Sequence, residues 1–333
     1  MDVYWMFLKT IVNTMVSLIV AAFALFTSAR PPEVDRPRLP AFVRASFGAG
    51  GGPAITRGGQ WSADAANRLA AELQANDPAR RARAACEIGR AGAAANSMIP
   101  RLVDTLADDA TVAGDVCGDW GRRTSHGEVA DTTPGERAAA ALVKIGTVSV
   151  EPLIGALNDR RWHARRSAAW ALGALDDARA VQPLIAALGD AEPPVRRNAA
   201  WALGALDDDR AVDALMAALG DADADTRAQA AWALGAIDAA RAAPALVRAL
   251  SDSDVRVRRQ AAWGLGAIGS AEGVDGLLRT LEQDRDAAVR SQAAWALGAI
   301  GDGRASAALA VALKDPDAKV RRQAAWALGA VAR

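Results

Sequence analysis

The sequence predicts an all-α protein, an α-solenoid (α-α superhelix) of about seven 31-residue helix pairs followed by a terminal helix. Ala-Ala-Trp recurs six times, at intervals of 31, 31, 31, 32 and 31 residues. In each copy an aspartate precedes an arginine by six residues. Periods of this length are typical of supersecondary units that stack on their neighbours. The repeated tryptophans are Trp170, Trp201, Trp232, Trp263, Trp295 and Trp326.

One unit, residues 190–220, shows why each repeat is a helix pair. In residues 195–206, Val195, Ala199 and Leu203 fall on one face at 100° per residue, as in an amphipathic helix. A second apolar run of helical spacing follows a turn of three aspartates. Two helices of about three turns fill such a unit, so no room remains for a strand.

The aspartate and arginine of each unit predict a ladder of ion pairs along the stack. With the aspartate in the turn and the arginine in the first turn of the next helix, each arginine can reach its own or a neighbouring unit's aspartate. A second aspartate, such as Asp223, suits helix capping. We assign these charges to the fold and not to catalysis. The pairs are Asp159 and Arg165, Asp190 and Arg196, Asp221 and Arg227, Asp252 and Arg258, Asp284 and Arg290, and Asp315 and Arg321.

The units before residue 159 are degenerate. Residues 81–92 and 99–106 fit one helix pair, and residues 138–146 and 150–157 fit another. Thr133 has the spacing of a capping box, with proline at the first helical position. The solenoid is therefore expected to span residues 63–333.

The amino-terminal residues have the pattern of a targeting segment. In residues 1–29, Lys9 precedes the apolar run 11–26, and small residues follow it, as in a signal peptide or membrane anchor. A buried core helix is the alternative. Residues 30–62, rich in proline and glycine, predict a flexible linker. We therefore expect an extracytoplasmic protein, periplasmic or secreted, or one anchored to the inner membrane, with membrane contact only through residues 11–26.

Composition excludes several classes of function. Lys plus Arg and Asp plus Glu both number 39, and binding to nucleic acid requires clustered cations, so no nucleic-acid partner is expected. Two histidines and two cysteines cannot furnish a conventional zinc or di-iron site, so we expect no metal and no cofactor. The sequence has no Walker loop, dinucleotide fingerprint or nucleophile elbow, and we assign no catalytic residue.

An insertion at residues 108–133 interrupts the repeat and contains Cys117, Trp120 and His126. Insertions in solenoids often carry binding, although a tolerated surface loop fits equally well. Cys86 stands where later units have tryptophan. In an exported protein Cys86 and Cys117 would form a disulfide and hold the insertion against the tryptophan-bearing wall, whereas two unlinked thiols are the alternative.

The tryptophans and the arginines near them form a candidate partner-binding face. On a helical wheel Trp201 lies on the flank of the apolar face and not at its middle. Tryptophan and arginine are enriched in binding hot spots. The alternative is that each indole fills space between neighbouring helices. The arginines are Arg166, Arg197, Arg259 and Arg322.

The repeat resembles the HEAT repeat, in particular the HEAT-like repeats of the phycobilisome-lyase type. The matching residues are the aspartate, the Val-Arg pair as in Val195 and Arg196, the Ala-Ala-x-Ala-Leu-Gly-Ala-Ile run at residues 293–300, and Pro-Leu-Ile at 152–154 and 183–185. The resemblance implies a right-handed α-solenoid with the arginine-bearing helices on its concave wall. It implies little about function, because such repeats serve many tasks.

Three functions follow as hypotheses. The first is a non-catalytic protein-protein interaction scaffold, exported or membrane-tethered, that binds an unidentified protein or peptide on the concave face. The second, implied by the lyase-type resemblance, is a bilin-lyase-like or prosthetic-group chaperone. The third is a sensor module of an envelope signalling system. HEAT-like di-iron hydroxylases use His-Glu pairs, but Gly127 follows His126 and Ala164 follows His163, which excludes that activity.

Overall fold

The computed structural model describes residues 61–113, 116–117 and 131–332. Contacts divide the chain into Met1–Arg38 and Leu39–Arg333, and all described residues belong to the second unit. The expected signal or anchor segment, nearly all of the linker, and Trp120 and His126 of the insertion lie outside these residues. Within them, no helix is both long enough and apolar enough to span a membrane.

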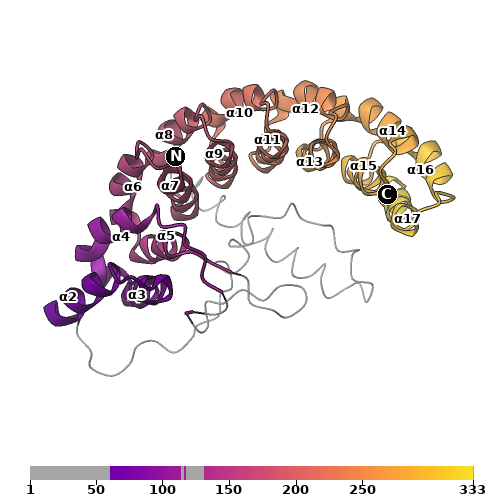
Figure 1. The fold of residues 1–333 in the computed structure, drawn as a ribbon. Helices are drawn as coiled ribbons and strands as arrows, with labels where there is room; N and C mark the ends of the chain where they lie inside the picture. Colours follow the sequence, from indigo (N-terminus) through magenta and orange to yellow (C-terminus); the bar gives the residue numbers. More distant parts are fainter. Residues whose placement is uncertain (1–60, 114–115, 118–130, 333) are drawn as a thin grey trace, which may run out of the picture. The chain divides into compact units, whose positions relative to one another are not determined.

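The described residues form helix pairs arranged along an arc, with inner helices of odd number and outer helices of even number (Figure 1). Consecutive inner helices pack side by side, and each also packs on an outer helix. The predicted all-α solenoid is therefore confirmed. The inner helices are α3 (Pro78–Ala91), α5 (Pro134–Ile145), α7 (Trp162–Leu175), α9 (Pro193–Ala205), α11 (Ala224–Ala236), α13 (Val255–Ile268), α15 (Ala287–Ile300) and α17 (Ala318–Val331). The outer helices are α2 (Ala63–Glu72), α4 (Ile99–Thr105), α6 (Val150–Ala156), α8 (Val181–Ala187), α10 (Val212–Ala218), α12 (Ala243–Ala249), α14 (Val274–Gln283) and α16 (Ser306–Ala312).

Short 3₁₀ helices connect most inner helices to the outer helices that follow them. They turn the chain without a long loop, and each outer helix then packs on the inner helix that follows it. These elements are η2 (Gly92–Met98), η3 (Thr147–Ser149), η4 (Ala178–Ala180), η5 (Asp209–Ala211), η6 (Ala240–Ala242), η7 (Ala271–Gly273) and η8 (Gly303–Ala305).

Aspartate or threonine side chains cap six of the eight described inner helices, whereas α7 and α9 begin after Arg161 and Glu192 without a side-chain cap. Asp223 accepts a hydrogen bond from the backbone N–H of Thr226 at 2.8 Å, and Asp254, Asp286 and Asp317 also cap their helices. Thr133 accepts from the backbone N–H of Glu136 at 3.1 Å, with Pro134 as the first residue of α5. Each cap satisfies a helical N–H that has no partner within the helix. The capping expected for these residues is confirmed.

Alanine and leucine fill the core. The leucine two residues after each of the first five repeated tryptophans is buried, whereas alanines line the contacts between neighbouring inner helices. Alanine adds little bulk, so adjacent inner helices can approach closely along the concave side of the arc. Leu172, Leu203, Leu234, Leu265 and Leu297 are all fully buried.

The first helix of the described chain was not expected from the repeat. Residues 63–72 form α2, whose N-cap Ser62 accepts a hydrogen bond from the backbone N–H of Ala65 at 3.1 Å. The segment carries neither the repeated tryptophan nor the aspartate-arginine pair, so it gives no repeat signal. It packs on α3 and extends the stack at its amino-terminal end.

Candidate functional site

Five of the six repeated indoles, all except Trp170, pack edge-on against a glycine of the preceding unit. A Cβ atom at Gly204 would lie 2.9 Å from Cζ3 of Trp232 and 2.8 Å from Cβ of Ala233. Real Cβ atoms do not approach so closely, so only glycine permits this contact. The other glycines that meet the next unit's indole in this way are Gly173, Gly235, Gly266 and Gly298.

Exposure of the indoles varies along the stack. Trp170 and Trp201 are 5% and 3% exposed, and their rings stack with centroids 6.4 Å apart. Trp232 and Trp263 stack similarly at 6.3 Å but are half-buried, as is Trp295. Trp326, in the last described helix, is 41% exposed. The tryptophans thus pack between units, and the later ones expose more of their rings than Trp170 and Trp201 do.

The aspartates and arginines form a ladder that joins each unit to the next. Arg196 donates from Nη1 to the backbone carbonyl of Asp190 in its own turn at 2.9 Å. Its Nε and Nη2 donate to the two carboxylate oxygens of Asp221 in the next unit, both at 2.7 Å. The two side chains are 13% and 12% exposed. The same arrangement recurs at Arg165, Arg227, Arg258 and Arg290.

This pairing lowers the pKa of the ladder carboxylates. The hydrogen bond from Arg227 is the main cause of the lowered pKa of Asp252, opposed by burial and assisted by the backbone N–H of Asp254. The pKa values of Asp190 and Asp315 are lowered in the same way, by Arg165 and Arg290. These carboxylates stay ionised in the folded protein under mildly acidic conditions.

The ladder has irregular ends. Arg81 binds Asp108 through Nε and Nη2 in the same geometry, a pair that the sequence analysis missed. The equivalent position in α5 is Gly135, and Asp159 binds Arg161 of its own turn at 2.8 Å. At the other end Arg321 donates to backbone carbonyls at 2.7 and 2.9 Å but has no carboxylate partner within the described chain.

A second series of arginines, also missed, lies in the turns from inner to outer helices. Arg179 binds Asp177 at 2.8 Å and reaches Glu151 of the preceding unit at 3.0 Å. The hydrogen bond from Arg179 lowers the pKa of Asp177 to about 2. Arg304 makes the same kind of contact with Asp275, at 3.1 Å. These arginines are half exposed, so such pairs contribute little stability. Their sequence signal is Asp-x-Arg, repeated in three units.

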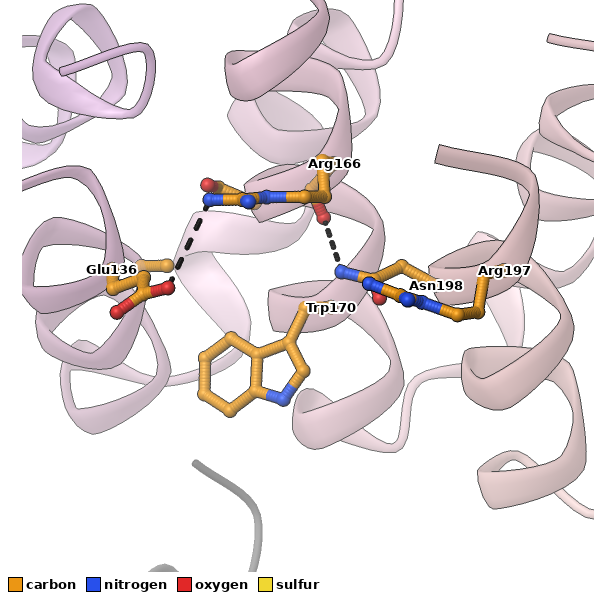
Figure 2. Close-up of a pocket in the computed structure, with 7 residues that line it drawn as sticks. Glu136, Arg166, Trp170, Arg197 and Asn198 are labelled. Carbon is orange, nitrogen blue, oxygen red and sulfur yellow. Dashed lines mark hydrogen bonds and ion pairs between the residues drawn. The ribbon is translucent and has the colours of Figure 1, made fainter. Parts of the chain in front are cut away.

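A pocket of about 120 Å³ lies on the concave wall between α5, α7 and α9 (Figure 2). Arg166 lies 3.8 Å from Glu136, and Arg197 lies 3.5 Å from Asp225, so both ion pairs are loose. The indole of Trp170 lies below both arginine side chains in the view of Figure 2. The pocket is lined by Glu136, Ala139, Arg166, Ser167, Trp170, Arg197 and Asn198.

The structure brings together only part of the candidate binding face. Arg166, Arg197 and Trp170 meet in the pocket, whereas Arg259 and Arg322 lie farther along the wall, on α13 and α17. Sequence reasoning missed Glu136, Ser167 and Asn198. Asn198 donates to the backbone carbonyl of Arg166 at 3.0 Å and so links α9 to α7. Its sequence signal is a polar residue three positions before every repeated tryptophan: Ser167, Asn198, Gln229, Gln260, Gln292 and Gln323.

The base of the insertion is attached to the inner helices. Cys86 of α3 and Cys117 are buried and joined in a disulfide, with their Cα atoms 5.9 Å apart. Val112 and Thr132 form an antiparallel bridge with backbone bonds of 2.8 and 3.0 Å, which closes the neck of the insertion. Nε2 of His163, at the start of α7, lies 3.1 Å from a carboxylate oxygen of Asp109. The described ends of the insertion therefore lie next to the helices that form the pocket.

A profile of HEAT repeats matches residues 135–194, 150–231, 181–262, 213–286 and 244–329, which together cover more than half of the chain. This match confirms the resemblance seen in the sequence. No curated protein matches the chain.

Two solved structures with TM-scores above 0.5 agree with the fold. YibA of Escherichia coli is 18% identical, with a TM-score of 0.56, over 80% of this chain and 92% of that chain. A mutant of Kap121p is 13% identical, with a TM-score of 0.61, over 81% of this chain and 33% of that chain. The CpcE–CpcF complex of phycocyanin lyase from Nostoc is 22% identical over 86% of this chain and 98% of that chain, with a TM-score of 0.40. Likeness at these identities concerns the fold and not the activity.

Proposed function

Because the chain belongs to the HEAT-repeat family, we propose that it is a non-catalytic scaffold that binds a segment of another protein on its concave wall. The observation that carries this proposal is the pocket of Figure 2, which two arginines and an indole line together. Tryptophan and arginine dominate the energetics of many interfaces because they combine apolar area with hydrogen-bond donors.

The charges favour a segment with an acidic side chain beside an apolar one. The ladder arginines form bidentate pairs, whereas Arg166 and Arg197 lie 3.8 and 3.5 Å from Glu136 and Asp225. Arg166 also lies over the ring of Trp162, 5.5 Å from its centroid. Such loose, solvent-exposed pairs are weak, so a carboxylate of the partner can replace them. A guanidinium then binds that carboxylate, and an adjacent apolar side chain packs against Ala139 and Trp170.

Selection from a random peptide library on the purified protein tests this assignment. We expect enriched peptides with Asp or Glu next to an apolar residue. Arg166→Glu combined with Arg197→Glu should weaken their binding by about tenfold or more. The matched control is Arg179→Glu with Arg210→Glu, which changes the same number of charges in the turns outside the concave wall. Equal loss in both double variants would show nonspecific charge attraction and refute the pocket.

We also propose that the scaffold is exported, either free or tethered to the inner membrane through residues 11–26. The support is the apolar run near the amino terminus, the linker after it, and the disulfide between Cys86 and Cys117. Disulfides persist in oxidising compartments and are rare in the cytosol. Cell fractionation with thiol labelling tests this: we expect the protein in the envelope fraction with both cysteines blocked. Recovery from the cytosol alone, with two free thiols, would refute export.

A further inference from the structure

The concave pocket lies beside the shortest member of a repeated series of polar side chains. The residue three positions before each repeated tryptophan is serine at Ser167, asparagine at Asn198 and glutamine in the later units. In α9 the side chain of Asn198 spans the gap to α7 and donates to the backbone carbonyl of Arg166 at 3.0 Å (Figure 2). A serine side chain is too short to span the same gap from α7 to α5. The gap therefore stays open at Ser167, where the pocket of about 120 Å³ lies. The glutamines of the series are Gln229, Gln260, Gln292 and Gln323.

The polar groups of this pocket lie at two depths. Ser167 and Asn198 form its floor and are 4% and 7% exposed. Arg166 and Arg197 form its rim, with side chains that are 24% and 39% exposed. Within the described part of the chain, no hydrogen bond joins the hydroxyl of Ser167 to another residue. A ligand group that reaches the floor therefore gains a hydrogen bond from Ser167 in addition to its contact with the arginines.

We propose that the pocket takes a glutamate side chain of the partner and that Ser167 is the residue that selects it, an inference that rests on the proposed scaffold function. Glutamate has nearly the shape of glutamine, which stands at the position of Ser167 in four later units. It also carries the charge that Arg166 and Arg197 complement. Its carboxylate extends past the rim and accepts a hydrogen bond from the Ser167 hydroxyl. Aspartate is shorter by one methylene group, so its carboxylate contacts the arginines without reaching the floor.

Glu136 opposes the incoming carboxylate and provides a test of opposite direction. It accepts a hydrogen bond from Oγ1 of Thr132 at 3.2 Å and lies 3.8 Å from Arg166. Its charge has the same sign as that of the ligand, and like charges at short range repel each other. Glu136→Gln keeps the shape and the acceptor for Thr132 but removes the charge. We therefore expect this variant to bind a glutamate side chain about threefold or more tightly than the unmodified protein does.

The probes are three capped dipeptides: acetyl-Glu-Leu-amide and its counterparts with Asp and with Gln. NMR titration of the isotope-labelled full chain, followed at the backbone amides of α7, measures their binding. We expect the Glu probe to bind about fivefold or more tightly than the Asp probe and about tenfold or more tightly than the Gln probe. Ser167→Ala should reduce the preference for Glu over Asp to less than about twofold, and Ser167→Gln should weaken binding of the Glu probe by about tenfold or more because it fills the pocket. The matched control is Ser291→Gln, the same change on α15 outside the pocket, which should alter binding by less than about twofold.

The outcomes separate this inference from the function on which it rests. Thermal unfolding establishes that each variant folds, and Ser167→Ala provides the test if Ser167→Gln does not. If Arg166→Glu with Arg197→Glu abolishes binding but the Ser167 variants keep the preference for Glu, the pocket binds acidic segments without selection by Ser167, and only this inference is refuted. Equal binding of the Glu and Asp probes to the unmodified protein refutes it as well. If no probe perturbs α7 while library peptides bind through the two arginines, the scaffold function stands and this inference fails; if no library peptide binds either, both fail.

Discussion

Gly204→Ala is expected to destabilise the solenoid by about 2 to 3 kcal/mol, although alanine is the better helix former by about 1 kcal/mol. The new methyl group would lie 2.8 Å from both Cα and Cβ of Ala233 and 2.9 Å from the indole of Trp232. Because backbone atoms are among the contacts, neighbouring helices must move apart and lose packing along α9 and α11. Urea denaturation followed by circular dichroism measures the loss, and hydrogen exchange shows whether it is confined to these units.

Gly329→Ala is the matched control, at the same position of the last unit. Nothing lies within 4 Å of the added Cβ atom there, so the helix propensity of alanine should act alone and stabilise the protein by up to about 1 kcal/mol. The same substitution should therefore change the free energy of unfolding in opposite directions at the two positions. Destabilisation of similar size at both would mean that the close approach of the indole to Gly204 is not what makes glycine necessary.

The contact between glycine and tryptophan shows which features of the fold could be predicted from the sequence. The period of 31 residues and the apolar face of each helix predict the helix pairs, because both are patterns of residue type along the chain. The exposure of Trp232 and Trp326 depends on how closely neighbouring helices approach, which the residues of a single unit do not determine. A helical wheel places an indole on a flank but cannot tell what lies against that flank.

The pocket was harder to anticipate for a related reason. Arg166 and Arg197 belong to the regular repeat and were selected as candidates, but Glu136 comes from the degenerate unit of α5, where the repeated tryptophan is absent. The residues of the ladder, in contrast, could be predicted from the sequence. The sequence left open only whether each arginine pairs with the aspartate of its own unit or of a neighbouring unit. Packing of consecutive inner helices determines that Arg196 pairs with Asp221 and not with the side chain of Asp190.

Asp221→Asn should lower the free energy of unfolding by about 2 to 4 kcal/mol, because it leaves the guanidinium of Arg196 charged and largely buried without a counterion. The matched control is Asp208→Asn, which removes a carboxylate that binds Arg210 within the same turn at 2.7 Å. Arg210 is half exposed, so water solvates it after the change and we expect a loss below about 1 kcal/mol. Urea denaturation of both variants under the same conditions makes the comparison.

A double variant separates an unpaired charge from lost packing. Arg196→Met combined with Asp221→Asn removes both charges, so it should be more stable than Asp221→Asn alone if the buried charge causes the loss.

Stability should also depend on pH in a defined direction. The pKa of Asp252 is lowered in the folded state, so its pairing contributes stability above the pKa of an unfolded aspartate, near 3.9, and loses it as the pH falls through the folded value. Arg227→Gln should therefore reduce the fall in the unfolding midpoint between about pH 5 and pH 3, and an unchanged fall would show that the ladder carboxylates do not determine the acid sensitivity of the stack.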